Sequence, residues 1–205
     1  LATNAEQSSG AEHWAFRPPV HASVPQVRQQ GLVRNPIDAF LLQSLETHNL
    51  TLAPEADRLT LLRRASFDLT GLPPSPADIR EFLADQRPNA YELLIEKLLS
   101  SPHYGERWAR HWLDVVGYAE SAGILNEDRQ IPNAWRFRDY VIRAFNSDKP
   151  WDRFLQEQIA GDELTDYWKQ YETQPQLSDD VVEGIIATGY LRMAADSSRP
   201  DFKTI

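Results

Sequence analysis

The chain has 205 residues, of which 41% are hydrophobic, and its 21 basic and 30 acidic side chains give a net charge of −9. This length is sufficient for a buried core, whereas the acidic balance argues against binding to nucleic acid or anionic membranes, which reward a basic surface. No apolar run approaches the ~20 residues that span a bilayer. Because cysteine is absent, these residues can form no disulfide, zinc-thiolate site or covalent haem attachment.

The beginning of the chain is predicted to lie outside the helical part. Residues 1–12 are small and polar without periodicity, which indicates a flexible linker. Residues 13–25, HWAFRPPVHASVP, are aromatic but interrupted by prolines, which favours an extended strap across a helical surface over a helix. We therefore expect one helical domain over residues 13–205. The start at Leu1 without methionine suggests a processed or excised piece of a longer protein.

Two helices are expected after the strap. Asn35 is suited to cap the first, with Pro36 at its first helical position. The second is expected over about 54–69, and it would end where Gly71 can adopt a left-handed conformation. The residues expected to face inward are Ile37, Phe40, Leu41, Leu42 and Leu45 in the first helix, and Leu59, Leu62 and Phe67 in the second.

Further helices are expected along the rest of the chain. Ser75 is suited to cap one, and Asn89 with Glu92 resembles a capping box. Additional helical segments are predicted over about 103–119, 134–147, 151–161 and 179–192, the last capped by Ser178. Residues 162–177 are expected to form a loop with a short helix. Because no segment alternates with period two, we predict an all-α fold, an irregular helical bundle of about seven or eight helices with an extended N-terminal strap.

A row of polar residues lies within RWARHWLDVVGYAES, residues 107–121. On one helix, Arg107, His111, Asp114 and Tyr118 would fall within ~60° of arc. Asp114 could then orient His111 as a general base, while Arg107 and Tyr118 contact a substrate. In the alternative that we favour, Arg107 pairs with His111 and Asp114 with Tyr118, as a hydrogen-bonded seam against another helix. The row is a candidate catalytic site, and no metal site is predicted there.

A second row, in NAWRFRDYVIRAFN, consists of Arg136, Tyr140 and Arg143. Two arginines beside a tyrosine suit a carboxylate, sulfate or phosphate group of a ligand. The same side chains would equally suit Asp114 or Glu120 on the preceding helix, and the net acidic chain favours this internal pairing.

The six tryptophans raise the possibility of stacking against sugars. Trp108 and Trp112 are expected to be buried, whereas Trp151 and Trp168 lie at expected helix edges and are the better candidates for an exposed platform. The acidic clusters GDELTD at 161–166 and SDD at 178–180 lack the spacing of an EF-hand loop. Solvated loops and helix N-termini explain these clusters.

Several long motifs carry a resemblance to a known family. In chain order, these motifs are HWAFRPP, NPIDAFLLQSLE, LLRRASFDLTGLPPSPADI, YGERWARHWLDVVGYAES, NAWRFRDYVIRAFNSDKPWDRFLQEQIAGDEL and IIATGYLR. Over roughly residues 13–192 they closely resemble the planctomycete-specific cytochrome-associated domain of unknown function. Gly117 stands where the family tends to have arginine, which puts in doubt any site that requires that cation.

The resemblance implies a role but no established activity. Such domains are typically found in large exported proteins beside a cytochrome-c-like domain, and in many relatives a CxxCH haem-attachment motif follows the IATGYLR-like stretch. We therefore expect a helical module of an exported, periplasmic or cell-surface, multidomain c-type cytochrome protein that lacks the family's C-terminal portion. Its partner would be a haem-bearing part outside this chain, and its own residues would bind no cofactor. The alternative is an enzyme or binding module that acts on a glycan through the row at Arg107, His111, Asp114 and Tyr118.

Overall fold

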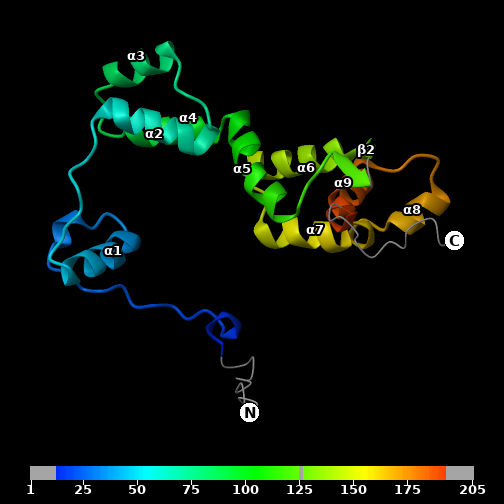
Figure 1. Ribbon diagram of the computed structural model, residues 1–205, viewed down its shortest axis with the longest axis horizontal. Coiled ribbons are helices and arrows are strands. Elements are labelled where there is room, and N and C mark those ends of the chain that lie inside the picture. The colour runs from blue at the N-terminus through cyan, green and yellow to red at the C-terminus, as the bar shows by residue number, and fades with distance from the viewer. Residues whose placement is uncertain (1–12, 125–126, 193–205) are drawn as a thin grey trace. The chain divides into compact units, whose positions relative to one another are not determined.

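The computed structural model describes residues 13–124 and 127–192, and it divides the chain into two units, Leu1–Glu55 and Ala56–Ile205 (Figure 1). The predicted linker, residues 1–12, lies outside the described residues.

The first unit contains one α-helix, α1 (Pro36–Thr47), and two short 3₁₀ turns, η2 (Trp14–Phe16) and η3 (Gln30–Leu32). As predicted, Asn35 caps α1; its side chain accepts hydrogen bonds from the backbone of Ile37 and Asp38, and Asp38 completes a capping box. The end of α1 is tied to the preceding loop by Glu46, whose carboxylate accepts the backbone N–H groups of Arg28 and Gln29, each at 3.1 Å.

The predicted apolar face of α1 is wrong in most positions. Leu42 is fully buried, but Ile37, Phe40 and Leu41 are 68%, 41% and 51% exposed. Within the described residues of this unit, α1 is the one α-helix, and a helix without a second helix or sheet against its flanks buries a narrow stripe. The predicted strap has no regular structure over residues 17–28, and Val20 is 87% exposed.

The second unit is helical in its described part, which confirms the all-α prediction. Its elements in chain order are α2 (Arg58–Thr70), α3 (Pro76–Ala84), α4 (Ala90–Leu99), α5 (Pro102–Val115), β1 (Ser121–Ile124), β2 (Glu127–Gln130), α6 (Ala134–Asn146), α7 (Trp151–Leu164), α8 (Tyr167–Thr173), α9 (Asp179–Ala187) and η4 (Thr188–Arg192). The two strands form an antiparallel hairpin in which Ser121 pairs with Gln130. The sequence did not predict this hairpin, because SAGI and EDRQ lack apolar alternation.

The turn between α2 and α3 follows the sequence closely. Gly71 ends α2 with φ = 71°, a left-handed conformation that glycine adopts without steric cost. Ser75 caps α3 in a capping box with Asp78. The predicted start of α2 near residue 54 is wrong, because the helix begins at Arg58, behind Asp57, whose side chain accepts from the backbone of Thr60 at 3.0 Å.

Two other predicted capping residues stand at the N-cap position, as expected, but their side chains do not cap the helix. Asn89 precedes α4 and Ser178 precedes α9, but neither side chain makes a capping hydrogen bond. At Asn89, φ = −102° and ψ = 22° differ from the extended conformation of an ordinary N-cap.

In α2, Leu62 is fully buried as predicted, whereas Leu59 and Phe67 are 46% and 40% exposed.

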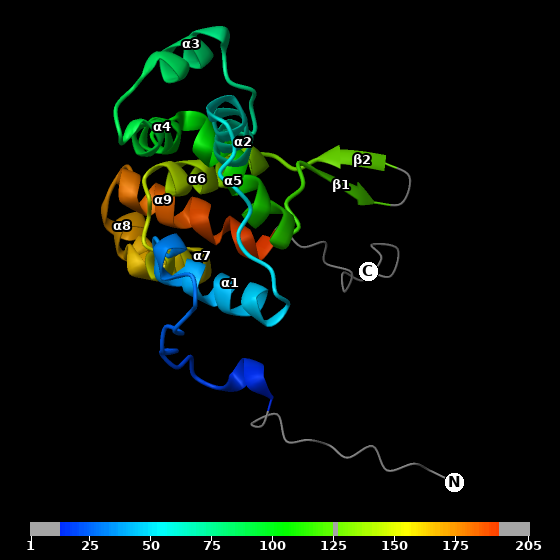
Figure 2. The same ribbon diagram turned by 90° about the vertical axis from the view of Figure 1, so that its left-hand side faces the viewer.

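The main core lies where α6 packs against α5 and α9, and where α7 meets α9 (Figure 2). Helix α6 contributes its centre, which is formed by Phe137, Tyr140 and Val141, and α7 adds Phe154. A smaller cluster joins α2, α3 and α4 through Leu62, Phe82, Ala90 and Leu94.

Candidate functional site

The row at residues 107–118 does not lie on one helical face. Helix α5 ends at Val115, and Gly117, with φ = 65°, reverses the chain so that the N–H of Tyr118 donates to the carbonyl of Leu113 at 2.9 Å. This is the hydrogen bond of a Schellman motif. The predicted helix over 103–119 is therefore too long, and Tyr118 leaves the face that Arg107, His111 and Asp114 share.

The three remaining members of the row have separate surroundings. The aliphatic part of Arg107 lies over Gly71, where an added Cβ would come 3.0 Å from its Cδ, and its Nε atom is buried without a hydrogen-bond partner. His111 is exposed, with its ring 5.2 Å from that of Trp108. Asp114 lies 3.9 Å from Arg110 on the same helix. Within the described residues, no hydrogen bond joins any two members of the row, so the expected seam is not formed.

Tyr118 belongs to a different network. Its hydroxyl donates to Glu120 at 2.9 Å, and Arg138 donates to the same carboxylate oxygen at 2.5 Å. Burial and the Glu120 carboxylate raise the pKa of Tyr118 to about 12. The phenol therefore stays protonated at neutral pH and acts here as a hydrogen-bond donor. The catalytic assignment of Arg107, His111, Asp114 and Tyr118 stays a prediction.

The side chains of the second row also contact different partners and do not form one site. Arg136 donates to Asn133 at 3.3 Å and lies 5.0 Å from the ring of Trp135. Tyr140 is buried and donates to Glu157 of α7 at 2.8 Å. Arg143 donates to Glu183 of α9 at 2.5 Å. Two of these partners are internal carboxylates, as the pairing alternative expects, but they come from α7 and α9 rather than from Asp114 or Glu120.

The two candidate tryptophans are exposed at separate places. Trp151 is 55% exposed and meets Trp112 edge to face, with ring centres 5.2 Å apart. Trp168 is 60% exposed and packs on Tyr167 at 5.0 Å. Their role in ligand binding stays a prediction, as does that of Arg136, Tyr140 and Arg143.

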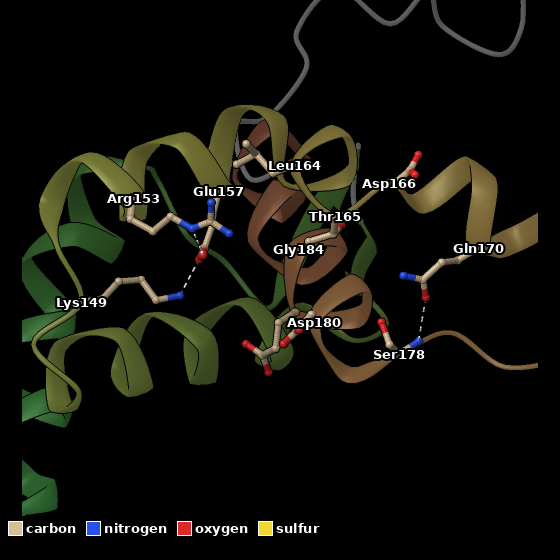
Figure 3. Close-up of a pocket in the computed structure, with 11 residues that line it drawn as sticks. Lys149, Arg153, Glu157, Leu164, Thr165, Asp166, Gln170, Ser178, Asp180 and Gly184 are labelled. Atoms are coloured by element: carbon tan, nitrogen blue, oxygen red, sulfur yellow. Dashed lines mark hydrogen bonds and ion pairs between the residues drawn. The ribbon is translucent and has the colours of Figure 1, made fainter.

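A cavity of about 540 Å³ lies between α7, α8 and α9 (Figure 3). Its lining is almost entirely polar and consists of Lys149, Arg153, Glu157, Leu164, Thr165, Asp166, Gln170, Ser178, Asp180, Glu183 and Gly184. The volume falls within the ~300–1,000 Å³ of ordinary ligand pockets. None of the nine side chains proposed from the sequence is among these lining residues, although Tyr140 and Arg143 each bond to one of them.

Glu157 organises one wall of this cavity. Its carboxylate accepts hydrogen bonds from Tyr140 of α6 at 2.8 Å, from Lys149 in the loop between α6 and α7, and from Arg153, one turn earlier in α7, at 2.8 Å. Burial by itself would raise the pKa of Glu157, but the hydrogen bonds from Lys149, Tyr140 and Arg153 outweigh burial and lower it. Burial and the same contact raise the pKa of Tyr140. Glu157 is therefore ionised and holds two cations in fixed positions.

The opposite wall depends on a break in α7. Ala160 has non-helical angles, φ = −144° and ψ = 34°, and it separates the turn of Arg153 and Glu157 from the turn of Leu164. Asp166 follows with φ = 53°, a left-handed conformation that Asp tolerates better than most residues. Asp166 precedes α8 and Gln170 lies within it, and both line the cavity. At ~100° per residue, Trp168 lies about half a turn away from Gln170 on α8. Trp168 is therefore not part of this cavity.

The sequence contained weak signals for this cavity. Arg153 and Glu157 are readable as an ordinary i,i+4 pair. Asp166 and Asp180 belong to the clusters GDELTD and SDD, which were assigned to solvated segments. What was missing is the packing of α7 on α9, which brings these segments to one place.

A smaller cavity of about 150 Å³ lies between α3 and α4. Its charged side chains are committed to one another: Lys97 bonds Asp78 at 3.0 Å and Glu81 at 2.8 Å, and Arg87 bonds Asp85 at 2.7 Å. Few polar groups there remain for a ligand, so the cavity between α7, α8 and α9 is the better candidate.

In residues 13–124 and 127–192, no group of three or more His, Asp or Glu side chains is placed to hold a metal ion. No helix in those same ranges has the length and apolar character to cross a membrane.

Residues 36–204 match the model of the PSCyt2 family, described as a protein of unknown function (DUF1549). This match covers most of the chain, which therefore belongs to that family. No curated protein and no solved structure is significantly similar to the chain.

Proposed function

We propose that this chain is a helical module of an exported, multidomain c-type cytochrome protein, and that it packs against a haem-bearing part outside these residues. Membership of the PSCyt2 family, whose name points to a cytochrome association, supports this proposal. Because the chain has no cysteine, the covalently attached haem would belong to that other part. The chain would contribute an interface that shapes the haem surroundings or the docking of an electron donor.

The observation that carries the packing part of the proposal is a set of apolar side chains on α5 and α7, two helices that touch through Trp112 and Trp151. Trp112 on α5 meets Trp151 on α7 edge to face, and each of these helices carries one further exposed apolar residue, Val115 on α5 and Ile159 on α7. Val115 is 77% exposed and Ile159 is 65% exposed. We call these four residues the α5–α7 surface.

This surface is suited to a partner for energetic reasons. Complete burial of one large apolar side chain stabilises a complex by ~1.5–3 kcal/mol, before the costs of association. Exposed apolar groups that gather at one place, rather than singly, commonly mark interaction sites. The interfaces of electron-transfer proteins are small, so a few such residues are sufficient for one.

The first test is the mass and absorption spectrum of the longest native polypeptide that contains these residues. We expect a mass beyond Ile205 and the reduced spectrum of a c-type haem, in a periplasmic or cell-surface fraction. A haem-free polypeptide that ends near Ile205 would contradict the proposal.

The second test addresses the interface in that same polypeptide. Val115→Glu and Ile159→Glu are expected to shift the midpoint potential of the haem, or to expose the junction between the two parts to limited proteolysis. Leu99→Glu is the control, because Leu99 is 37% exposed on α4 and lies outside the α5–α7 surface. Equal effects of all three changes would show general destabilisation and not a specific interface.

A further inference from the structure

We propose that the cavity between α7, α8 and α9 binds an uncharged polyhydroxylated ligand, namely a sugar unit. This inference does not depend on the proposed cytochrome role. It concerns a different surface from the predicted row at residues 107–118, and it uses none of that row's side chains.

The polar groups of the cavity fall into two sets. In the first set, Glu157 is occupied by its three donors, and Glu183 is occupied by Arg143. The hydroxyl of Thr165 donates to the carbonyl of Gly161 at 2.7 Å. These groups are committed to the protein and fix the shape of the cavity.

The second set is available to a ligand. Asp180 and the hydroxyl of Ser178 have no bonding partner within the described residues, and Asp166 has only Lys169, at 3.8 Å. Arg153 uses its Nε atom on Glu157, and Gln170 uses its carbonyl oxygen on the backbone N–H of Ser178 at 3.2 Å. The terminal nitrogens of both side chains remain free as donors.

The available groups that line the cavity therefore include both donors and acceptors. Arg153 and Gln170 donate, Asp166 and Asp180 accept, and the hydroxyl of Ser178 does either. A ligand that satisfies them all must offer donors and acceptors close together. Neighbouring hydroxyl groups on a sugar ring do this, because each hydroxyl donates one hydrogen bond and accepts others. Hydrogen bonds from hydroxyl groups to the two carboxylates would be charge-assisted.

The charge and polarity of the lining disfavour other classes of ligand. Two cations and four carboxylates line the cavity, so an anionic ligand would meet net repulsion. The carboxylates are not grouped as metal ligands within the described residues. An apolar ligand would contact one apolar side chain, Leu164. It would also displace the water that hydrates the free polar groups, and it could not replace the hydrogen bonds that this water makes. The volume of about 540 Å³ leaves room for a sugar ring with bridging water.

The experiment is a titration of the chain followed by the shifts of its backbone amide NMR signals. The probes are glucose, galactose, mannose and xylose, with glucosamine and galacturonic acid as charged comparators. We expect saturable shifts with at least one neutral sugar, confined to α7, α8 and the first turn of α9. Galacturonic acid should bind more weakly than galactose, because its carboxylate meets the acidic lining.

Two matched variants test the site itself. Asp180→Ala removes one free acceptor and should weaken binding of the neutral sugar about fivefold to tenfold. Asp179→Ala removes the same charge from the same first turn of α9, but Asp179 does not line the cavity. That control should change the affinity less than twofold.

The proposal is overturned if no neutral sugar gives saturable shifts, or if glucosamine alone binds. It is also overturned if the shifts lie elsewhere in the chain, or if the two variants weaken binding equally. The thermal unfolding midpoints of both variants are compared with that of the unchanged chain. This comparison shows whether a variant that loses binding is still folded.

Discussion

Gly161 in α7 and Gly184 in α9 lie backbone against backbone. A Cβ added to Gly161 would come within 2.3 Å of the Gly184 carbonyl oxygen, and one added to Gly184 would come within 2.5 Å of the Gly161 carbonyl oxygen. Glycine is therefore required at both positions because there is no space for a Cβ atom, and not because of the backbone conformation. This contact fixes the crossing of α7 over α9, and with it the cavity that the two helices line.

Gly161→Ala is accordingly expected to destabilise the protein. The methyl group would meet backbone atoms that cannot rotate away, and overpacking of this kind costs ~1–3 kcal/mol. The measurement is the free energy of unfolding from denaturant titration. Gly189→Ala is the control, because its Cβ would lie 3.4 Å from the Phe137 side chain, which is close to an ordinary contact. Equal losses in both variants would argue against a special requirement at the crossing.

Glu157→Gln is expected to lower stability at neutral pH by ~1–3 kcal/mol, because it weakens the charged hydrogen bonds from Lys149 and Arg153. The pKa of Glu157 in the folded protein is lowered from its ordinary value of 4.5. Between the two values the unfolded chain binds more protons, so stability rises with pH across that window. The contribution of Glu157 is therefore complete above pH 4.5 and is lost as the pH falls through the folded value.

The measurement is the free energy of unfolding of the unchanged chain and of Glu157→Gln over a range of acidic pH. Their difference should shrink below pH 4.5. Glu163→Gln is the control, because Glu163 is exposed on the same helix. A difference that stays constant with pH would mean that the ionised carboxylate of Glu157 is not the source of the stabilisation.

Arg87→Gln is expected to change the titration of Asp85. The side-chain hydrogen bond from Arg87, followed by that from its backbone N–H, lowers the pKa of Asp85 from 3.8 to about 2. Without the guanidinium, the pKa should rise toward 3.8. The carboxyl carbon shift of Asp85 reports this directly by NMR. Arg80→Gln removes an equal charge from the exposed side of α3 and should leave that titration unchanged.

Asn146→Ala is expected to loosen the contact between α5 and α6. The Asn146 side chain accepts from the backbone N–H of Gly105 at 2.7 Å and donates to the carbonyl of Pro102 at 3.0 Å. A part-buried N–H left without its acceptor costs ~1–3 kcal/mol. Hydrogen exchange at the Gly105 amide should accelerate by more than exchange at amides of α3, which lies outside this contact. Unchanged protection at Gly105 would contradict the assigned hydrogen bond.

The sequence by itself determined the features of this protein that depend on neighbouring residues. Asn35 before Pro36, Ser75 before Pro76 and Gly71 before a pair of prolines place helix ends correctly, because the side chain or backbone freedom at each position acts within one turn. The all-α class follows from the same local patterns. The long motifs likewise indicate membership of the PSCyt2 family.

Only the tertiary structure decided which polar residues come together. Gly117 ends α5 early and removes Tyr118 from the expected face. Tyr140 donates to Glu157 on α7, a helix that no sequence pattern places beside it. The cavity likewise combines Arg153, Asp166 and Asp180 from three helices. Contacts of this kind depend on how the helices cross. Helices α7 and α9 cross where Gly161 and Gly184 have no side chains. Two glycines produce no pattern of charge or hydropathy, so the sequence does not reveal this crossing.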